Sequence, residues 1–413
     1  MMTSLVWRAG AAEVDITPPI NLSMDGYMAR QGPSLGQYDP LLAQIVVIED
    51  VSGRRLAIVT LDVLAVSAVF ADPLRQSLAA QIGTDASAVV VCPSHTHCGP
   101  LGLQTWFPLG EGPQLDAVLV NMIGERLQAA ATVALERLQP ARLKAGASTV
   151  TGIGGNRNRS DTPVDSQVTT FVFENEAGTP FCILYHYACH PSVLGADTNF
   201  YSADFPGATR QRLKQVYPQA VSLFVNGALG DISTRYQRRD QSYAEVIRLG
   251  TRLADHIIAL VSAAQPLDGA LGWGELHLDL PFRALPEAVD AIPQVMPQDR
   301  ITQTKAEGAI IQSKIRRAIG ERTGQSMTLT WLRLGEWVMA AVPGEPFNAL
   351  AVVLRECYPQ ALVLALANDY LGYFPTQEAI DSQTYEALSS PYDARAILGI
   401  ESLLTAFLSN LKD

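Results

Sequence analysis

The chain has few cysteines and few charges. Its five cysteines among 413 residues include no CxxC pair, and an odd number without that spacing argues against a disulfide framework and against a Cys-rich zinc finger. We therefore expect reduced thiols. Only 17% of the residues are charged, and the net charge is -11. Because the chain offers no basic field for phosphate backbones, we expect no nucleic acid partner.

Long apolar runs are also missing. The run at 257–264 is apolar but far shorter than the roughly 20 residues that span a bilayer, so the sequence predicts no transmembrane segment. The start, from Met1 to Arg8, has no basic region followed by an apolar stretch and a small-residue cleavage site. Without a secretory signal, the sequence predicts a cytoplasmic protein.

The hydrophobic content of 48% is sufficient for a large core. No repeat, low-complexity tract or linker divides the chain, and the simplest interpretation is a single domain over residues 1–413. Short β-rich runs alternate with amphipathic helical stretches, which is typical of an α/β layer architecture. Four prolines interrupt the pattern between Gly269 and Arg300, and we expect an insertion or a lid around 269–300.

Local patterns predict the individual elements. Expected strands lie at 55–62, 88–92, 168–174, 180–187, 220–225 and 361–366, with a hairpin at 327–342; expected helices lie at 73–82, 115–138, 204–217, 243–262, 306–321, 347–356 and 394–411.

Three of the six histidines follow expected strands. His95 and His97 come directly after the strand at 88–92, and His190 follows the hairpin that ends at 187. In an extended segment His95 and His97 would point to the same side. Either both bind one metal, or one binds the metal while the other acts as an acid or base. For the remaining three we expect hydrogen-bonded structural or surface positions: His186, His256 and His277.

Several segments resemble those of one family, in the same order. Ser94-His-Thr-His-Cys-Gly-Pro100 is similar to the Ser-His-Thr-His-Ser-Gly-Pro motif of the neutral, alkaline non-lysosomal ceramidases. The other similar segments are Met24-Asp-Gly-Tyr27, Asn158-Arg-Ser160, Ala188-Cys-His190, Ser202-Ala-Asp204, Gly230-Asp-Ile-Ser233, Pro343-Gly-Glu345 and Asn368 to Tyr385. The resemblance implies the fold of that family's catalytic domain, an α/β fold with a mixed β-sheet core and flanking helices.

The resemblance also implies a zinc site. Carried over position by position, the ligands are His95, His190, Glu345 and Tyr373, with Tyr370 as the alternative to Tyr373. Imidazole nitrogens and a carboxylate suit Zn²⁺, which can keep one position open for water or substrate.

Three further residues are implied as catalytic: His97, Tyr385 and Arg159. Arg157 is the alternative to Arg159, because it lies only two residues away and permits a rival alignment. An arginine at this place would bind a carbonyl or carboxylate oxygen with its planar fork.

One position departs from the family. Alignment on Gly230-Asp231 places the family's proposed serine at Gly227, and Ala228 follows it. A hydroxyl is therefore expected to be missing at this position. The expectation favours attack on the substrate by a water that zinc activates.

The sequence thus predicts a zinc-dependent hydrolase that cleaves a linear amide bond in a small-molecule or lipid-like N-acyl amine, such as a ceramide-like substrate. His97 would move a proton toward the leaving amine, while Tyr385 and Arg159 would stabilise the oxyanion. Two alternatives stay open: a zinc hydrolase of an ester or lactone, and a non-catalytic homologue that binds a metal or ligand. The sequence indicates no oligomeric state.

Overall fold

A computed structural model describes residues 7–105, 115–285 and 299–411. Its largest sheet has nine strands, eight of them in the order β11-β9-β8-β6-β1-β3-β4-β5, with β13 paired to β6. The sheet is mixed, because β4 and β5 run parallel, as do β9 and β11, while the other pairs are antiparallel. The strands are β1 Trp7–Asp15, β3 Leu42–Glu49, β4 Arg55–Leu61, β5 Val89–Pro93, β6 Gln139–Thr149, β8 Gln167–Glu174, β9 Pro180–Tyr187, β11 Val221–Asn226 and β13 Gln265–Pro266.

A second sheet of four strands has the order β14-β15-β16-β18. Its strands are β14 Leu271–Pro281, β15 Gly324–Leu334, β16 Trp337–Val342 and β18 Ala361–Ala365. One buried cluster joins the facing sides of the two sheets, with Trp7 and Leu223 from the first sheet and Trp337 and Leu362 from the second. Burial of such side chains contributes about 1.5–3 kcal/mol each, so the sheets are held together by a shared apolar core.

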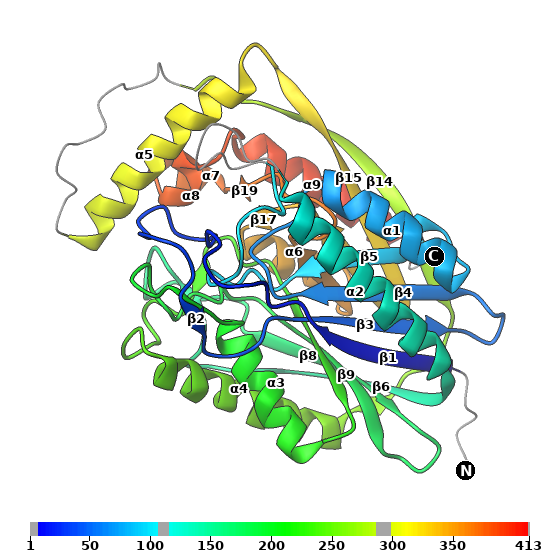
Figure 1. The fold of residues 1–413 in the computed structure, drawn as a ribbon. Coiled ribbons are helices and arrows are strands. Elements are labelled where there is room, and N and C mark those ends of the chain that lie inside the picture. Colours follow the sequence, from blue (N-terminus) through cyan, green and yellow to red (C-terminus); the bar gives the residue numbers. More distant parts are fainter. Residues whose placement is uncertain (1–6, 106–114, 286–298, 412–413) are drawn as a thin grey trace.

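Helices cover the outer faces of both sheets (Figure 1). Four of them share a buried cluster with the first sheet, and two pack on the second. The first group is α1 Ala68–Ile82, α2 Ala117–Glu136, α3 Asp204–Val216 and α4 Tyr243–Ala263; the second is α6 Ala349–Cys357 and α9 Ala394–Asn410. The described chain is therefore layered helix, sheet, sheet, helix.

Short strand pairs bring together segments that are distant in the sequence. β7 Gly155–Asn156 pairs with β12 Ile232–Ser233, and β17 Glu345–Pro346 pairs with β19 Tyr373–Phe374. The remaining elements are β2 Gly36–Gln37, β10 Phe200–Tyr201, the 3-10 turn η1 Ala86–Ala88, and the helices α5 Arg300–Ile319, α7 Gln377–Asp381 and α8 Tyr385–Leu388. These pairings position most of the residues discussed below.

The structure agrees with the expected α/β fold and its mixed sheet. The first part of 269–300 is a regular strand. Leu271–Pro281 is β14, which pairs with β15 along its whole length. Leucine at 276, 278 and 280 gives the two-residue alternation of a strand that covers a core on one side, and Pro281 ends it. Residues 286–298 of the expected insertion or lid lie outside the described residues, so the insertion or lid and the single domain stay predictions.

No helix in the described segments is both long and apolar enough to cross a bilayer. The cytoplasmic location stays a prediction.

Candidate active site

His95 is the second residue after β5. Its φ of 70° lies in the left-handed region, which residues other than glycine rarely adopt. The ring Nδ1 lies 2.8 Å from the carbonyl oxygen of Leu64. We assign the ring proton to Nδ1, where it can be donated to this carbonyl, so that Nε2 carries a lone pair.

His190 follows β9 and has the same arrangement. It forms an isolated parallel bridge with Ser233, and its Nδ1 lies 2.9 Å from the carbonyl oxygen of Ile232. Burial, together with the positive charge of Arg157, lowers the pKa of His190 to about 4. The imidazole is therefore neutral near pH 7 and presents a lone pair at Nε2.

Glu345 is the first residue of β17, which pairs with β19 in a small sheet of its own, and it faces the two histidines. Its Oε2 lies 3.5 Å from His95 Nε2 and 3.0 Å from His190 Nε2, while Oε1 accepts a hydrogen bond of 2.6 Å from the Tyr370 hydroxyl. Burial alone would raise the pKa of this carboxyl, whereas a positive charge on His95 and a hydrogen bond from His190 would lower it well below its usual range. Glu345 is fully buried, so its charge needs a partner.

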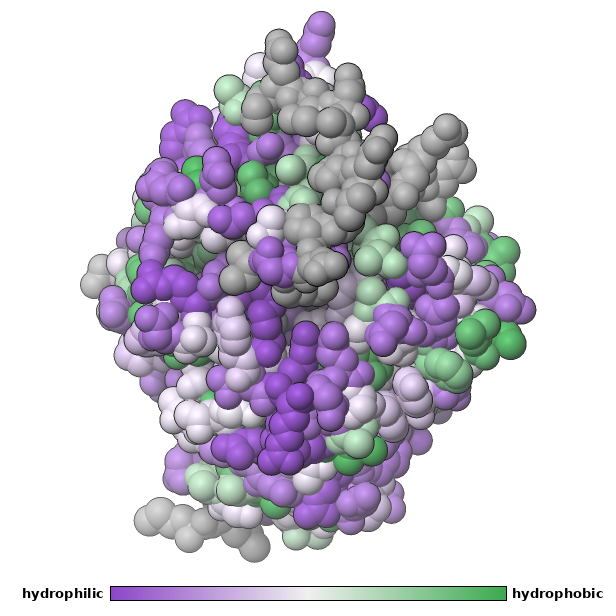
Figure 2. All heavy atoms as spheres, turned by 90° about the vertical axis from the view of Figure 1, so that its left-hand side faces the viewer, coloured by the Kyte–Doolittle hydropathy of each residue, from purple (hydrophilic) through white to green (hydrophobic). Residues whose placement is uncertain are grey.

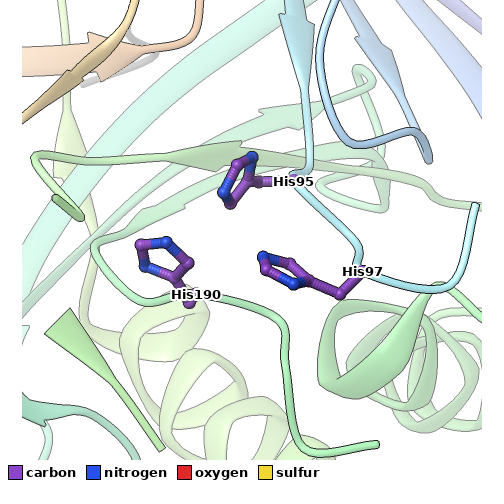
Figure 3. Close-up of side chains that lie close together, drawn as sticks. All are labelled: His95, His97 and His190. Carbon is purple, nitrogen blue, oxygen red and sulfur yellow. The ribbon is translucent and has the colours of Figure 1, made fainter. Parts of the chain in front are cut away.

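A divalent metal fits this group of atoms. With both ring protons on Nδ1, the two Nε2 atoms and the carboxylate oxygen are acceptors that face one another, and His95 Nε2 and Glu345 Oε2 have no hydrogen-bond donor. The ligand atoms of His95, His97 and His190 lie within 4.8 Å of one another, and Figure 3 shows the three rings around a common space. Imidazole and carboxylate are donors that zinc accepts.

His97 is fixed by the segment that precedes β2. A Cβ atom at Gly26 would lie 2.7 Å from the His97 Cα, so only glycine fits there. The ring of Tyr27 lies 4.8 Å from that of His97, and its hydroxyl donates to the Leu194 carbonyl at 2.7 Å. Burial first, and then the nearby His95 and His190, lower the pKa of His97 well below its usual value. A neutral His97 is able to accept a proton.

The two candidate arginines lie in different environments. Arg157 is buried, pairs with Glu386 and has its Nη1 3.1 Å from His190 Nε2. Arg159 is 61% exposed at its side chain and pairs with Glu378 at 3.1 Å. The structure therefore brings the alternative, Arg157, to the histidines, and leaves Arg159 at the surface. A divalent metal would compete with Arg157 for the lone pair of His190.

One of the three candidate tyrosines contacts Glu345, and the other two lie near Arg157. Tyr370 donates to Glu345, whereas the rings of Tyr373 and Tyr385 lie 5.4 Å and 5.8 Å from the guanidinium carbon of Arg157. Burial is the largest cause of a raised pKa for each of the three hydroxyls. All three are therefore protonated near pH 7 and can donate hydrogen bonds.

A cavity of about 150 Å³ adjoins these groups. His190 is fully buried behind it, and the site residues that line it are His95, His97, Arg157, Glu345, Tyr370, Tyr373 and Tyr385. A second cavity of about 540 Å³ adjoins it. The residues common to both walls are Arg157, Asn158, Arg235, Thr304 and Tyr385. The helix α5 forms one side of both cavities through Thr304, and hydrophilic residues predominate on the described part of that face of the molecule (Figure 2).

Comparison with known families matches residues 7–238 to the neutral/alkaline non-lysosomal ceramidase N-terminal family. This region is more than half of the chain. The chain belongs to this ceramidase family. Membership implies a hydrolase that acts on an amide bond, and it confirms the resemblance found in the sequence.

Solved structures support the same fold. The neutral ceramidase from Pseudomonas aeruginosa is 18% identical with a TM-score of 0.79, covering 99% of this chain and 75% of that one. A ceramidase complexed with C2 is also 18% identical, with a TM-score of 0.81 and coverage of 99% and 76%. At this identity the likeness shows a shared fold. Comparison with curated proteins by sequence finds no match.

The position aligned with the family serine does not face the cavity. A Cβ atom at Gly227 would lie 2.9 Å from both the His186 ring and the Ala188 side chain, and Gly227 is absent from the residues that line the cavity. Ser192 and Ser233 do line it. Ser233 was visible in the sequence as part of the Gly-Asp-Ile-Ser segment, but nothing in its spacing indicated that it adjoins His190.

His186, beside Gly227, allows a test of acid stability. Its Nε2 lies 2.8 Å from the Val363 carbonyl, and burial lowers the pKa of His186 to about 4. Between pH 6.5 and 4 the unfolded chain binds the extra proton at this ring, so stability falls as the pH falls, by up to about 3 kcal/mol at pH 4. We expect His186→Gln, which keeps a donor near Val363, to lose less stability over this range than wild type. Thermal unfolding midpoints from pH 7 to 4.5 measure this; parallel profiles would contradict it.

Proposed function

We propose that the protein is a zinc-dependent hydrolase that cleaves the amide bond of N-acyl amines. The observation that supports this most directly is the convergence of two imidazole lone pairs and a carboxylate at 3.0–3.5 Å in a buried site. Membership of the ceramidase family gives the reaction class. The relative whose structure is described as complexed with C2 supports a lipid-like N-acyl compound as the substrate class.

His95, His190 and Glu345 are the proposed zinc ligands. Tyr373 is kept as the fourth, and Tyr370, whose hydroxyl is hydrogen-bonded to Glu345, is its alternative. Zinc bound by such donors lowers the pKa of a water and polarises a carbonyl. The carbonyls of Leu64 and Ile232 hold the two rings in the tautomer that ligation requires.

The chain's own side chains supply proton transfer and charge stabilisation. His97 is neutral and lies within 4.8 Å of the other two histidines, measured between ligand atoms, so it accepts the proton of the attacking oxygen and returns it to the leaving amine. Arg157 and Tyr385 line the same cavity and donate to the oxyanion that develops on the carbonyl oxygen. Arg157 takes the role that the sequence first gave to Arg159.

The source of the attacking oxygen has two candidates. We propose that a water attacks the substrate, as the sequence indicates. The second candidate is the Ser233 hydroxyl, because Ser233 lines the cavity and forms an isolated backbone bridge with His190. A serine attack would proceed through an acyl-enzyme, which water attack avoids.

Metal content tests the proposal first. We expect about one zinc per chain in purified wild type, and its loss in His190→Ala, because each zinc ligand removed lowers the coordination number. Elemental analysis measures this directly. His256→Ala is the matched control, since His256 lies on α4 and contacts Ser148 instead of the site; its zinc content should equal that of wild type. A folded wild type that takes up no zinc would refute the metal assignment.

Turnover of matched N-acyl amines and esters then tests the reaction. We expect amide hydrolysis by the zinc-loaded protein that is lost on chelation. Hydrolysis of the esters alone would favour an esterase, and zinc binding without turnover of either series would favour the non-catalytic homologue.

A further inference from the structure

Asp25 is a buried carboxylate in the wall of the cavity. It is 3% exposed and belongs to a segment that the main chain fixes beside the histidine motif: its backbone N–H donates to the Gly99 carbonyl at 3.0 Å, and Met24 forms an isolated bridge with Pro100. Together with His95 and His97 it lines the cavity. The reaction proposed above assigns it no role.

The carboxylate of Asp25 is incompletely satisfied. Oδ1 accepts from the Gly26 N–H at 2.9 Å, and Oδ2 accepts a long hydrogen bond of 3.4 Å from Gln104. In the described part of the chain no cationic nitrogen lies within ion-pair distance of it. A carboxylate has about four acceptor sites. These two contacts use half of them and leave the other half open.

The nearest guanidinium, that of Arg30, is directed at other acceptors. Its Nη1 donates to the backbone carbonyl of Asp25 at 2.6 Å, its Nη2 to that of His97 at 2.8 Å, and its Nε to that of Thr198 at 3.0 Å. Arg30 therefore braces the two main-chain segments and does not neutralise the carboxylate directly. Burial raises the pKa of Asp25, which reflects the cost of a charge with few partners.

We propose that Asp25 accepts a hydrogen bond from a hydroxyl or ammonium group that the substrate carries next to its scissile amide. The inference rests on the proposed amide hydrolysis and names Asp25 as a residue that determines which substrates this site prefers. A donor from the substrate would fill the unused acceptor capacity, whereas a purely apolar neighbour would leave the carboxylate with only the hydrogen bonds from Gly26 and Gln104. Sites built to hydrogen-bond a substrate group discriminate strongly against analogues that lack it.

Two matched substrate series test this with the zinc-loaded protein. The first varies the amine, as N-acyl ethanolamine, N-acyl ethylenediamine and N-acyl propylamine, with one acyl group throughout. The second varies the acyl side, as hydroxyacetyl, glycyl and propionyl amides of one amine. We expect kcat/KM for the hydroxyl or ammonium member to exceed that of the methyl member at least about tenfold in one series. Equal rates throughout both series would overturn the inference while leaving amide hydrolysis intact.

Variants assign the preference to Asp25. We expect Asp25→Leu to bring the ratio close to one, and Asp25→Asn, which still accepts from Gly26, to weaken the ammonium preference more than the hydroxyl preference. Glu307→Gln is the control, because Glu307 is a carboxylate of the same cavity that lies on α5, and its ratio should equal that of wild type. A preference that survives in Asp25→Leu, or is equally lost in Glu307→Gln, refutes the inference.

The same ratios are measured as Kd by calorimetry with each compound. An inactive but zinc-loaded protein therefore still tests Asp25. A tenfold ratio in Kd without turnover would refute the proposed reaction and support Asp25 as a binding group, and equal Kd values would refute Asp25.

Discussion

Ser233→Ala is expected to lower kcat/KM for amide hydrolysis by at least about 100-fold with zinc content unchanged. Ser233 is 5% exposed, lines the cavity and is bridged to His190, and its Oγ already accepts from the Arg235 N–H at 3.2 Å. The Ser233 hydroxyl is the acceptor in this bond, so its own proton can be donated to another group. Whether it positions a water or attacks, its loss removes a polar group from the reacting centre, and single groups of that kind contribute about 10²–10³ in rate.

Ser192→Ala is the matched control. Ser192 also lines the cavity, but its hydroxyl donates only a long hydrogen bond of 3.5 Å to the His190 carbonyl, so we expect less than about fivefold loss. Near-wild-type activity of Ser233→Ala would contradict the prediction. If Ser233 attacks and the acyl-enzyme is hydrolysed slowly, wild type releases a pre-steady-state burst of amine. With a substrate chosen for slow deacylation, no burst would indicate attack by water.

Arg157→Lys is expected to lower kcat/KM by about 10²-fold or more, because lysine keeps the positive charge but loses the planar fork. The lysine is chosen to retain a partner for Glu386, which is buried and paired with Arg157. Without a partner, such a charge destabilises the fold by about 3–5 kcal/mol. Steady-state kinetics measure the effect, with thermal unfolding to exclude loss of structure.

Arg159→Lys should change kcat/KM by no more than about twofold to threefold. Its side chain is 61% exposed, and ion pairs of exposed residues contribute about 0–1 kcal/mol. A larger loss in Arg159→Lys than in Arg157→Lys would return the role to Arg159.

Much of the fold could be predicted from local patterns. The run Val89–Pro93 is β-branched and buried on both faces, and the polar segment after it must emerge at the edge of the sheet. The same logic placed His190 after β9. Both histidines were therefore expected at strand ends, where α/β proteins usually bind ligands.

Other features depend on contacts that the sequence pattern does not contain. Arg157 and Arg159 differ by only two residues, and their separation into a buried and an exposed side chain follows from β7, a two-residue strand that pairs with β12 more than 70 residues away. The sequence likewise could not show that Gly227 packs against the His186 ring. At β14 the sequence prediction gave more weight to four scattered prolines than to the alternation of leucines. Only Pro281 lies within the strand.

The proposed zinc ligands come from segments that are made at different times during synthesis, beside the nine-stranded sheet and in the small β17–β19 sheet. His95 and His190 lie in the part matched to the ceramidase family, but Glu345 and Tyr373 meet only through the pairing of β17 with β19. A nascent chain that has emerged only as far as β11 has two of the proposed ligands, both imidazoles, and lacks the carboxylate of Glu345. If these residues bind zinc as proposed, the complete ligand set forms late in synthesis, only after β17 and β19 have left the ribosome.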